Sequence, residues 1–564
     1  MSGFLQTPPV LPDAWTSDRA LREVVAFHLG DERFAEAEPV LADMGRTATA
    51  AETLALALQA ESEPPQHQPY SAWGERVDII RVSPGYTELG RIGVEAGVTA
   101  LPYEDSPYGP AARVVWAGVM SLWGPSSALY SCPIAMTDGA ARTLLLHGDL
   151  DDMGAVGRLT TRNYEQAWTS GQWMTEMTGG SDVGRTQTVA RKGEDGLWRL
   201  YGTKWFSSAT TSEMALTLAR PEGAPEGSRG LALFRIHRDL DDGSRNAILV
   251  RRLKDKLGTR ALPTAELELQ GAVAHPIGDP FDGGGLRRIA TMLNITRIHN
   301  SLGATGGMGR GLAHARAFAR EREVFGRPLH EMPAHRATLA ELAVDHAAGL
   351  ALTFRCCELM GKVEHGAATE QETALLRGLT PLTKLATARW AVKVAAEVME
   401  SIGGVGYCED SGIPAYVRNT HVLPIWEGTT NVLSLDFLRA TARGGAFDAL
   451  EADVRATIGR LRDDAPFDLT RARTAVDGAL AELRTATETA LQDDAGQSWA
   501  RHIAVGLART YACVRLLGQG EWAAERGSTL SAAAGMRLLD RGLVPPRPIE
   551  ELGLAMDEEP TPQA

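Results

Sequence analysis

Several short segments of this chain combine polar or acidic side chains with glycine in a way that suits a ligand site. In residues 174–182, the hydroxyls of Thr175 and Ser181 flank the paired glycines Gly179 and Gly180. Glycine lets a backbone approach a flat or phosphorylated ligand closely, and hydroxyls can hydrogen-bond the polar edge of that ligand. Composition alone would also fit an ordinary turn, so the other segments of the chain must decide.

Two further segments place aromatic or basic side chains beside small polar residues. Residues 202–208, a strand-like run, set Phe206 before two serines. Aromatic rings in such runs belong more often to a core than to the wall of a cofactor site. Residues 318–328 carry Arg322 from the end of a helix into a turn that contains glycine and proline. A solvated basic helix end explains these arginines equally well, because the helix dipole favours cations there.

The last two segments lie closer to the C-terminus. Residues 400–407 are rich in glycine, and residues 424–431 contain an acid, Glu427, between Trp426 and Gly428. An acid in this setting suits a carboxylate at the mouth of a pocket. A lone glutamate is more commonly a solvated surface acid, so its role depends on the other segments.

Composition sets limits on the class of protein. The chain has 564 residues, which exceeds one ordinary hydrophobic core and predicts two to four domains. A net charge of −14 argues against a general affinity for phosphate backbones. No basic segment followed by an apolar core opens the chain, and no apolar run approaches the roughly 20 residues that span a bilayer. The five cysteines form no C-x-x-C pair, which fits a reduced compartment. We therefore expect a cytoplasmic protein that does not bind membranes or a metal.

The elements that must position these segments follow from the periodicity of the chain. Helical segments with proline-rich breaks, such as Glu63-Pro64-Pro65, extend to about residue 165. Strands follow from about 170, and strict alternation places Leu267 and Leu269 on one strand face. Helical spacing returns from about 285, as in residues 339–350, and predicts a bundle. Gly303 to Gly311 sits inside a helical pattern, so a Rossmann-type dinucleotide fold is not expected.

Taken together and in this order, the segments resemble the acyl-CoA dehydrogenase superfamily. Residues 174–182 resemble its T-E-x-x-x-G-S-D signature, and residues 322–326 match its R-x-x-F-G motif. Residues 256–260, 403–407 and 427–429 resemble three further signatures. The likeness is greatest to the AidB branch, flavoproteins of the bacterial alkylation-damage response. The resemblance implies an α+β fold with an N-terminal helical domain (1–168), a middle β domain (169–280), a helical bundle (281–445) and an additional helical domain with an acidic tail (446–564).

The resemblance also implies FAD as cofactor, bound between the β domain and the bundle. Arg322 would reach the pyrophosphate of FAD in a neighbouring subunit, which implies a homo-oligomer, usually a tetramer in this family. The cofactor-contacting positions implied by the resemblance are Met174, Thr175, Gly180, Ser181, Phe206, Ser207, Ser208, Arg322, Phe325, Gly403, Gly404, Trp426, Thr429 and Asn431.

Glu427 occupies the position of the family's catalytic base. Removing a proton α to a thioester needs a carboxylate in a dry pocket and hydrogen-bond donors where enolate charge develops. Hydride then passes from the β-carbon of the acyl thioester to the flavin, which an electron-transfer flavoprotein or dioxygen reoxidises. Arg297 matches a helix arginine near the family's active site and is a candidate for substrate binding; a structural ion pair is an equal alternative.

Three departures from the family pattern limit these expectations. Glu400 replaces the usual Gln, and Trp426 replaces the usual Tyr before the base, which could narrow the acyl pocket. AidB-like proteins bind DNA through a basic C-terminal domain, but residues 446–564 here hold 13 arginines and 19 acids, a balance of −6. Because duplex binding needs clustered cations, the alternative of a DNA-associated flavoprotein with little dehydrogenase activity is disfavoured.

Overall fold

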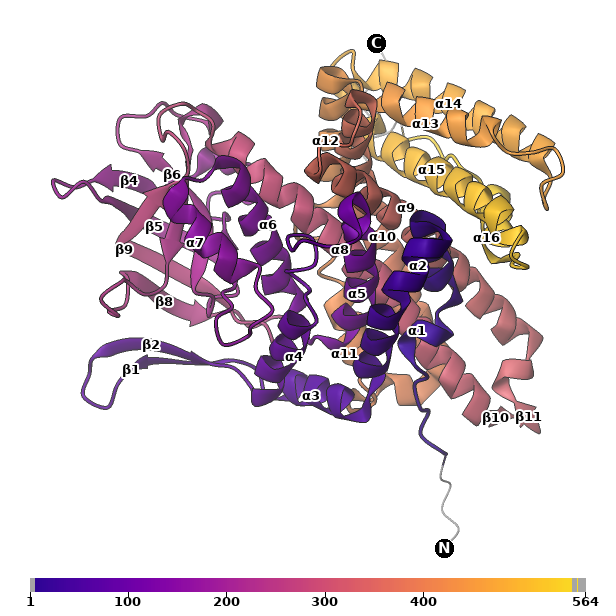
Figure 1. The fold of residues 1–564 in the computed structure, drawn as a ribbon, viewed down its shortest axis with the longest axis horizontal. Coiled ribbons are helices and arrows are strands. Elements are labelled where there is room, and N and C mark those ends of the chain that lie inside the picture. The colour runs from indigo at the N-terminus through magenta and orange to yellow at the C-terminus, as the bar shows by residue number, and fades with distance from the viewer. Residues whose placement is uncertain (1–5, 550–554, 556–564) are drawn as a thin grey trace, which may run out of the picture. The chain divides into compact units, whose positions relative to one another are not determined.

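The computed structural model describes residues 6–549 and residue 555. Contacts divide the chain into two units: residues up to 368 together with 387–428, and residues 369–386 together with the chain from 429 onward. The fold is α+β, as predicted, with helices, then a β domain, then helices again (Figure 1). The predicted domain boundaries at 168, 280 and 445 stay predictions, and the acidic tail expected at 556–560 lies outside the described residues.

The N-terminal part of the first unit is helical, as expected. Its helices are α1 (Ala14–Ser17), α2 (Arg19–Thr49), α3 (Ala51–Ser62), α4 (Pro84–Glu95), α5 (Ala112–Trp123), α6 (Ser131–His147) and α7 (Leu150–Leu159).

The proline break after α3 leads into a β-hairpin that the sequence pattern does not predict, formed by β1 (Gln66–Tyr70) and β2 (Arg76–Arg81). Its signal was weak because buried polar contacts, rather than alternating apolar residues, hold it. The carboxylate of Asp78 accepts from Arg76 and from the Val250 backbone N–H of the β domain.

The β domain is a closed barrel. Its strands are β3 (Ser170–Trp173), β4 (Val189–Lys192), β5 (Trp198–Ser208), β6 (Met214–Pro221), β7 (Ala232–His237), β8 (Ile248–Leu253) and β9 (Thr264–Pro276). Strands β6, β4, β5, β9 and β7 pair in that order, and β7 pairs back with β6. Strand β3 extends the sheet in parallel beside β6, and β8 pairs with β9. Closure leaves the five ring strands without a free edge.

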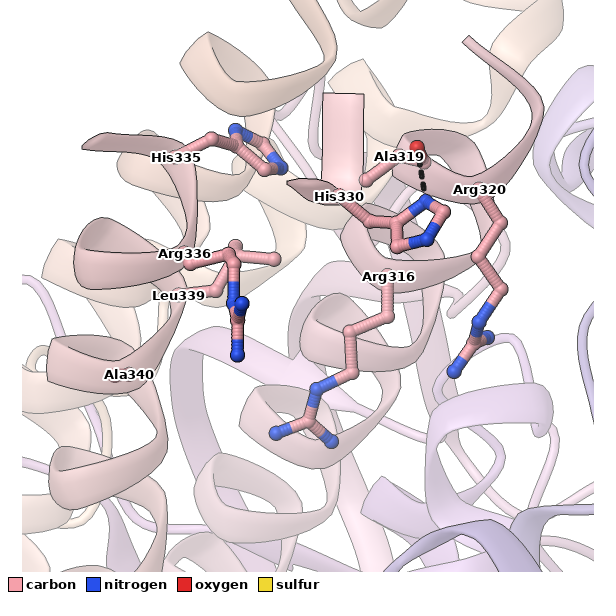
Figure 2. Close-up of a pocket in the computed structure, with 8 residues that line it drawn as sticks. All are labelled: Arg316, Ala319, Arg320, His330, His335, Arg336, Leu339 and Ala340. Carbon is pink, nitrogen blue, oxygen red and sulfur yellow. Dashed lines mark hydrogen bonds between the residues drawn. The ribbon is translucent and has the colours of Figure 1, made fainter. Parts of the chain in front are cut away.

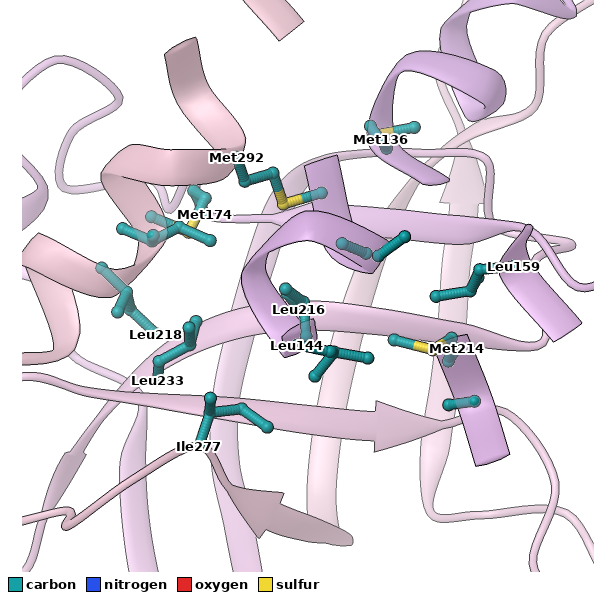
Figure 3. Packing of buried hydrophobic residues seen from close by; sticks show 14 of the residues in the cluster. Met136, Leu144, Leu159, Met174, Met214, Leu216, Leu218, Leu233, Ile277 and Met292 are labelled. Atoms are coloured by element: carbon teal, nitrogen blue, oxygen red, sulfur yellow. The ribbon is translucent and has the colours of Figure 1, made fainter. Parts of the chain in front are cut away.

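Two apolar cores lie on opposite faces of the barrel wall. Leu267 and Leu269 share one core, which confirms the predicted strand face. On β6, Leu216 and Leu218 belong instead to the other core, because neighbouring side chains of a strand point to opposite faces. Figure 3 shows this second core, in which Met292 of the long helix α8 (Gly285–Glu321) packs with the strand residues. The barrel wall is thereby fixed to α8.

The helices after the barrel form the bundle that the spacing predicts. Helix α8 is followed by the short hairpin β10 (Glu323–Val324) and β11 (Arg327–Pro328), then α9 (Pro333–Glu364), α10 (Glu370–Ile402) and α11 (Ile413–Thr420). The predicted helical residues 339–350 lie within α9, and Gly303 to Gly311 lie within α8. Met308, Leu342 and Val394 share the core of this bundle.

The second unit is helical, and α10 contributes its first half to it. Its other helices are α12 (Thr430–Gly444), α13 (Ala446–Gly459), α14 (Leu469–Ala490), α15 (Ala500–Ala524) and α16 (Leu530–Asp540). Helix α15 contacts the other four of these helices. Gly445, with a φ of 64°, separates α12 from α13. No helix within residues 6–549 has both the length and the apolar character needed to cross a membrane.

Candidate active site

Glu427 lies in a turn, held in an unusual backbone conformation. Its φ is +59°, in the left-handed region that side chains other than glycine rarely adopt, and Gly428 continues the turn at a φ of 106°. Thr296 Oγ1 donates to the Glu427 carboxylate at 2.7 Å, and Arg297 Nε donates to the Glu427 carbonyl at 3.2 Å. Strain of about 1–3 kcal/mol at such a residue persists only where the surroundings enforce it, and it is concentrated at functional sites.

Apolar side chains surround this turn. Trp426 packs against a core that contains Leu262, and the half-buried thiol of Cys132 packs against the same core. Burial, followed by the negative charge of Glu427, raises the pKa of Cys132 to about 12. The Glu427 carboxylate therefore acts on the Cys132 thiol in largely apolar surroundings, where its charge is poorly screened.

More left-handed residues occur around the same core. Ala128 and Leu129 have φ angles of 45° and 67°, and both pack on this core; Thr259, at 54°, lies in the turn before Leu262. Lys256 Nζ braces that turn, donating to the carbonyls of Thr259 and Leu262 at 2.6 and 2.7 Å. Burial lowers the pKa of Lys256 to about 8. Two further strained loops thus meet the Glu427 turn at this core.

The first two predicted cofactor segments lie side by side. The Trp205 N–H donates to the Thr175 carbonyl at 2.8 Å, and the Trp173 indole N–H donates to the Ser208 carbonyl at 3.4 Å. A Cβ added to Gly180 would lie 3.3 Å from the side chain of Thr175. Residues 174–181 and 205–208 are therefore neighbours on the barrel, although they are distant in sequence.

The individual residues of these segments differ in exposure. Phe206 is 52% exposed, and the Lys254 ammonium lies over its ring, 4.6 Å from the ring centroid. Ser181 is exposed, whereas Met174 packs in the core between the barrel and α8. Ser207 is buried, and its hydroxyl has no hydrogen-bond partner among the described residues.

The third predicted segment forms the tip of the β10–β11 hairpin. Phe325 and Gly326 make its two-residue turn, with φ angles of 49° and 79°. A phenylalanine in this left-handed position is strained, and its side chain is 97% exposed. Arg322 precedes the hairpin, and its guanidinium donates to Gln6 at 3.4 Å.

The remaining predicted residues lie at exposed positions. Gly403 and Gly404 open the short helix η6 (Gly403–Tyr407), and a Cβ added to either would meet no atom within 4 Å. Thr429 is the N-cap of α12 without a side-chain capping hydrogen bond, and both it and Asn431 are exposed. The described chain encloses none of these four residues.

Two polar arrangements near the predicted segments leave no pattern in the sequence. Thr296 holds the Glu427 carboxylate, yet a threonine inside a helical pattern carries no signal of its own. Glu176 is buried and pairs with the buried Lys204 at 2.8 Å, which fixes the turn after Thr175 on strand β5. Periodicity gives no hint of this pair, because both residues are polar at buried positions and only their contact explains them.

Three family models match the chain in succession. The AidB N-terminal domain matches residues 6–166, the acyl-CoA dehydrogenase middle domain matches residues 171–272, and the acyl-CoA dehydrogenase C-terminal domain matches residues 283–442. Helices, barrel and bundle in this order define a dehydrogenase of the acyl-CoA type.

Similar proteins agree with these matches. Acyl-CoA dehydrogenase family member 11 of Caenorhabditis elegans is 41% identical over 530 residues, which cover 91% of this chain and 85% of that protein. AidB of Escherichia coli is 35% identical over 420 residues, 73% of this chain and 75% of AidB. The crystal structure of C. elegans ACDH-11 in complex with C11-CoA superposes with a TM-score of 0.92 at 38% identity, covering 97% of this chain and 94% of that one. The chain therefore belongs to the acyl-CoA dehydrogenase family.

Proposed function

We propose that the protein is an FAD-dependent oxidoreductase that removes the α-proton of an acyl-CoA thioester with Glu427. The observation that carries this proposal is the Glu427 turn itself. A strained backbone, a threonine hydroxyl on the carboxylate and an arginine on the carbonyl hold one acid in a single orientation. A general base must be held in this way to reach a proton on a bound substrate.

The described residues fit a bound flavin. Backbone contacts hold Thr175 and Gly180 beside the strand that carries Phe206, and this half-exposed ring offers a flat apolar surface. The open space at Gly403 and Gly404 leaves room for a ligand to contact the protein backbone there. The proposed contact residues are Met174, Thr175, Gly180, Ser181, Phe206, Ser207, Ser208, Arg322, Phe325, Gly403, Gly404, Trp426, Thr429 and Asn431. When bound, the flavin supplies the acceptor for the hydride of the β-carbon.

The chain's own residues supply the acid–base part of the reaction. Glu427 accepts the α-proton, and Thr296 keeps the carboxylate oriented. Arg297 donates a hydrogen bond to the backbone carbonyl of Glu427. We therefore propose it as a positioning residue near the substrate. Trp426 forms part of the wall beside the acid and sets the width of the acyl pocket.

Replacing the base tests this proposal. Purified Glu427→Gln should keep its yellow colour but lose bleaching by acyl-CoA esters under anaerobic conditions. The exposed acid Glu194, in the turn between β4 and β5, provides a control, because Glu194→Gln should bleach like the wild type. Unchanged bleaching of Glu427→Gln would refute the assignment. A series of saturated acyl-CoA esters would define the substrate, and assays with an electron-transfer flavoprotein or dioxygen would define the acceptor.

We further propose that the protein assembles as a homotetramer. Large apolar side chains are exposed within the predicted cofactor segments, as at Met177, Phe325, Val405, Tyr407 and Ile425. Subunit contacts would cover such side chains, of which Phe325 and Tyr407 are the most exposed at 97% and 81%. Light scattering of the purified protein would measure the mass of the assembly.

Duplex DNA is not proposed as a partner of the C-terminal helices. Arginines there lie in salt bridges: Arg455 with Glu451 and Asp477, and Arg484 with Asp448. Similar pairs involve Arg462, Arg471, Arg473, Arg526, Arg537 and Arg547. Paired cations release few counterions on a phosphate backbone, so we expect no salt-sensitive binding in a duplex titration near physiological salt.

A further inference from the structure

A cluster of buried charges lies where α5, α6, α8 and α9 contact one another. The side chains of Arg113 on α5 and Asp138 on α6 are fully buried, and Arg113 Nη1 lies 2.7 Å from the Asp138 carboxylate. Arg113 Nε lies at the same distance from the carboxylate of Glu364, the last residue of α9. Although burial alone would raise it, the charge of Arg113 and the hydrogen bond from His299 hold the pKa of Asp138 well below its usual range. Asp138 is therefore an ionised group inside the protein.

His299 connects this cluster to α8. Its Nε2 atom lies 2.8 Å from the Asp138 carboxylate, and its ring meets the Trp116 ring edge-on, with 4.7 Å between the ring centroids. Burial lowers the pKa of His299 by more than the nearby carboxylate raises it, so the ring is neutral at neutral pH. Because an ionised carboxylate can only accept, Nε2 carries the hydrogen of the neutral ring. The other nitrogen, Nδ1, is buried without a hydrogen-bond partner among the described residues, so one hydrogen bond orients the imidazole.

The same turn of α8 holds the proposed base. Thr296, which donates to the Glu427 carboxylate, lies three residues before His299, and residues at this spacing are neighbours on a helix surface. Asn300 of this turn donates through Nδ2 to the Leu423 carbonyl at 3.3 Å, in the segment that leads to Glu427. A rotation or a slide of α8 would therefore disturb these contacts and the His299 contact together.

Helix α6 lies close against α8 at this level. An added Cβ at Gly139 would lie 2.6 Å from the Met292 side chain of α8. Asp138 directly precedes this glycine, so a tight apolar contact and the hydrogen bond from His299 together hold the two helices. Apolar packing can stabilise such a junction as well as buried charges do, but a hydrogen bond also fixes a distance and a direction. The cluster therefore adds a defined orientation to the contact between α6 and α8.

We propose that His299 is a positioning residue for Glu427, a role that rests on the proposed function of this acid as the base. The hydrogen bond between His299 and Asp138 sets the orientation of α8 in which Thr296 reaches the Glu427 carboxylate. His299 touches no reacting atom and transfers no proton. Without this hydrogen bond, α8 is less firmly oriented against α6, and the carboxylate loses part of its fixed orientation.

Two replacements of His299 in the full-length, yellow protein test this role. His299→Leu fills the space without a donor, whereas the amide of His299→Gln can still donate to Asp138. In stopped-flow bleaching of the flavin by acyl-CoA esters, His299→Leu should lower the maximal rate about tenfold and change the half-saturating concentration less than about twofold. His299→Gln should recover most of the rate, and equal losses in both variants would overturn the proposal.

A double variant separates positioning from a general loss of structure. Because His299 is proposed to act through Thr296, adding His299→Leu to Thr296→Val should slow bleaching less than about twofold further. Two losses that multiply in full would overturn the proposal, since they would show that His299 acts independently of this hydroxyl.

A readout that needs no catalysis distinguishes a failure of this proposal from a failure of the proposed function. The charge of Glu427 acts on the thiol of Cys132, the second residue of α6. His299→Leu should speed the alkylation of Cys132 at pH 9 at least about twofold, because the carboxylate is no longer held in place. In the Glu427→Gln background the same replacement should have no effect. An unchanged rate, or a rise that persists in that background, would overturn the proposal whether or not the wild type is bleached.

His346 provides the matched control. Its Nε2 atom lies 2.9 Å from the Asp18 carboxylate, and its Nδ1 atom is likewise buried without a hydrogen-bond partner among the described residues. This pair contacts α8 at Gly309, 13 residues beyond Thr296 and thus roughly 20 Å along the helix at 1.5 Å per residue. His346→Leu should leave the bleaching rate within about twofold. A loss equal to that of His299→Leu would overturn the proposal, because any buried histidine of the bundle would then have the same effect.

Discussion

Helix α8 contributes to two regions that differ in whether their polar and charged groups have partners within the chain. Near its middle, Thr296 and Arg297 satisfy the carboxylate and the carbonyl of Glu427. At its C-terminal end, Arg316 and Arg320 are exposed and form no salt bridge within residues 6–549. The hydrogen bonds to Glu427 favour one orientation of the acid, which a base that must meet a proton requires. The exposed guanidinium groups at the other end of the helix are solvated by water, so no partner fixes their orientation in this way.

The largest expected effect tests whether the two regions are independent. Glu427→Gln removes the proposed base and should lower kcat about 10²- to 10⁴-fold, whereas Arg316→Gln at the other end of the helix should change kcat less than about twofold. Steady-state assays of the two variants give both values. An equal loss of kcat in Arg316→Gln would show that the two regions are coupled.

The next effect concerns how the acid is held. Thr296→Val keeps the shape of the side chain but removes the hydroxyl that donates to Glu427, so kcat should fall about tenfold with little change in KM. Stopped-flow bleaching of the flavin measures the chemical step directly. Thr296→Ser keeps the hydroxyl and should recover most of the rate; equal defects in both variants would contradict a role for the hydrogen bond.

A smaller effect is expected at the hairpin that follows the basic end of α8. Phe325→Asn suits the left-handed turn better but removes a side chain that is 97% exposed. If a neighbouring subunit covers this ring, the variant should assemble several-fold more weakly, as light scattering across a dilution series would show. Leu150, 90% exposed outside the cofactor segments, is the control, and Leu150→Asn should assemble normally.

The smallest expected effect concerns the pKa of Cys132, which depends on the charge of Glu427. Burial and the charge of Glu427 raise the pKa of Cys132 to about 12, so the thiol is protonated at neutral pH. Neutralising the acid in Glu427→Gln should lower this pKa, because one source of repulsion for the thiolate disappears. Alkylation of Cys132 at pH 9 should then be about two- to threefold faster, by mass spectrometry. Arg316→Gln should leave the rate unchanged, and the exposed Cys408 serves as an internal reference.

How much of this could be predicted depends on whether a feature is local in sequence. The helical spacing of residues 339–350 and the alternation at Leu267 and Leu269 are local, and the structure confirms both. Closure of the barrel is not local, because β6 and β7 pair at the end of a ring that also needs β9. A strand pattern specifies faces but not which strands become neighbours.

The candidate site follows the same rule. Motif order singled out Glu427 as a candidate, but its partner Thr296 lies 131 residues earlier and only the fold brings the two together. The basic residues at the end of α8 and the start of α9 follow the same rule. Arg320 lies inside a motif segment and Arg316 just before it, and in the sequence both look like a solvated helix end; only the fold brings Arg336 close to them (Figure 2). Distance in sequence, rather than residue type, limits the prediction.

The close contact at Gly378 bears on how the chain can be shortened. In the second unit, a Cβ at this position of α10 would lie 2.8 Å from the Cβ of Ala446 and 3.4 Å from the ring of Phe437. A product that stops at residue 445 would lose α13 and uncover this stretch of α10. Expression trials that treat the C-terminal helices as a removable appendage should therefore yield aggregating material, while the intact polypeptide stays dispersed.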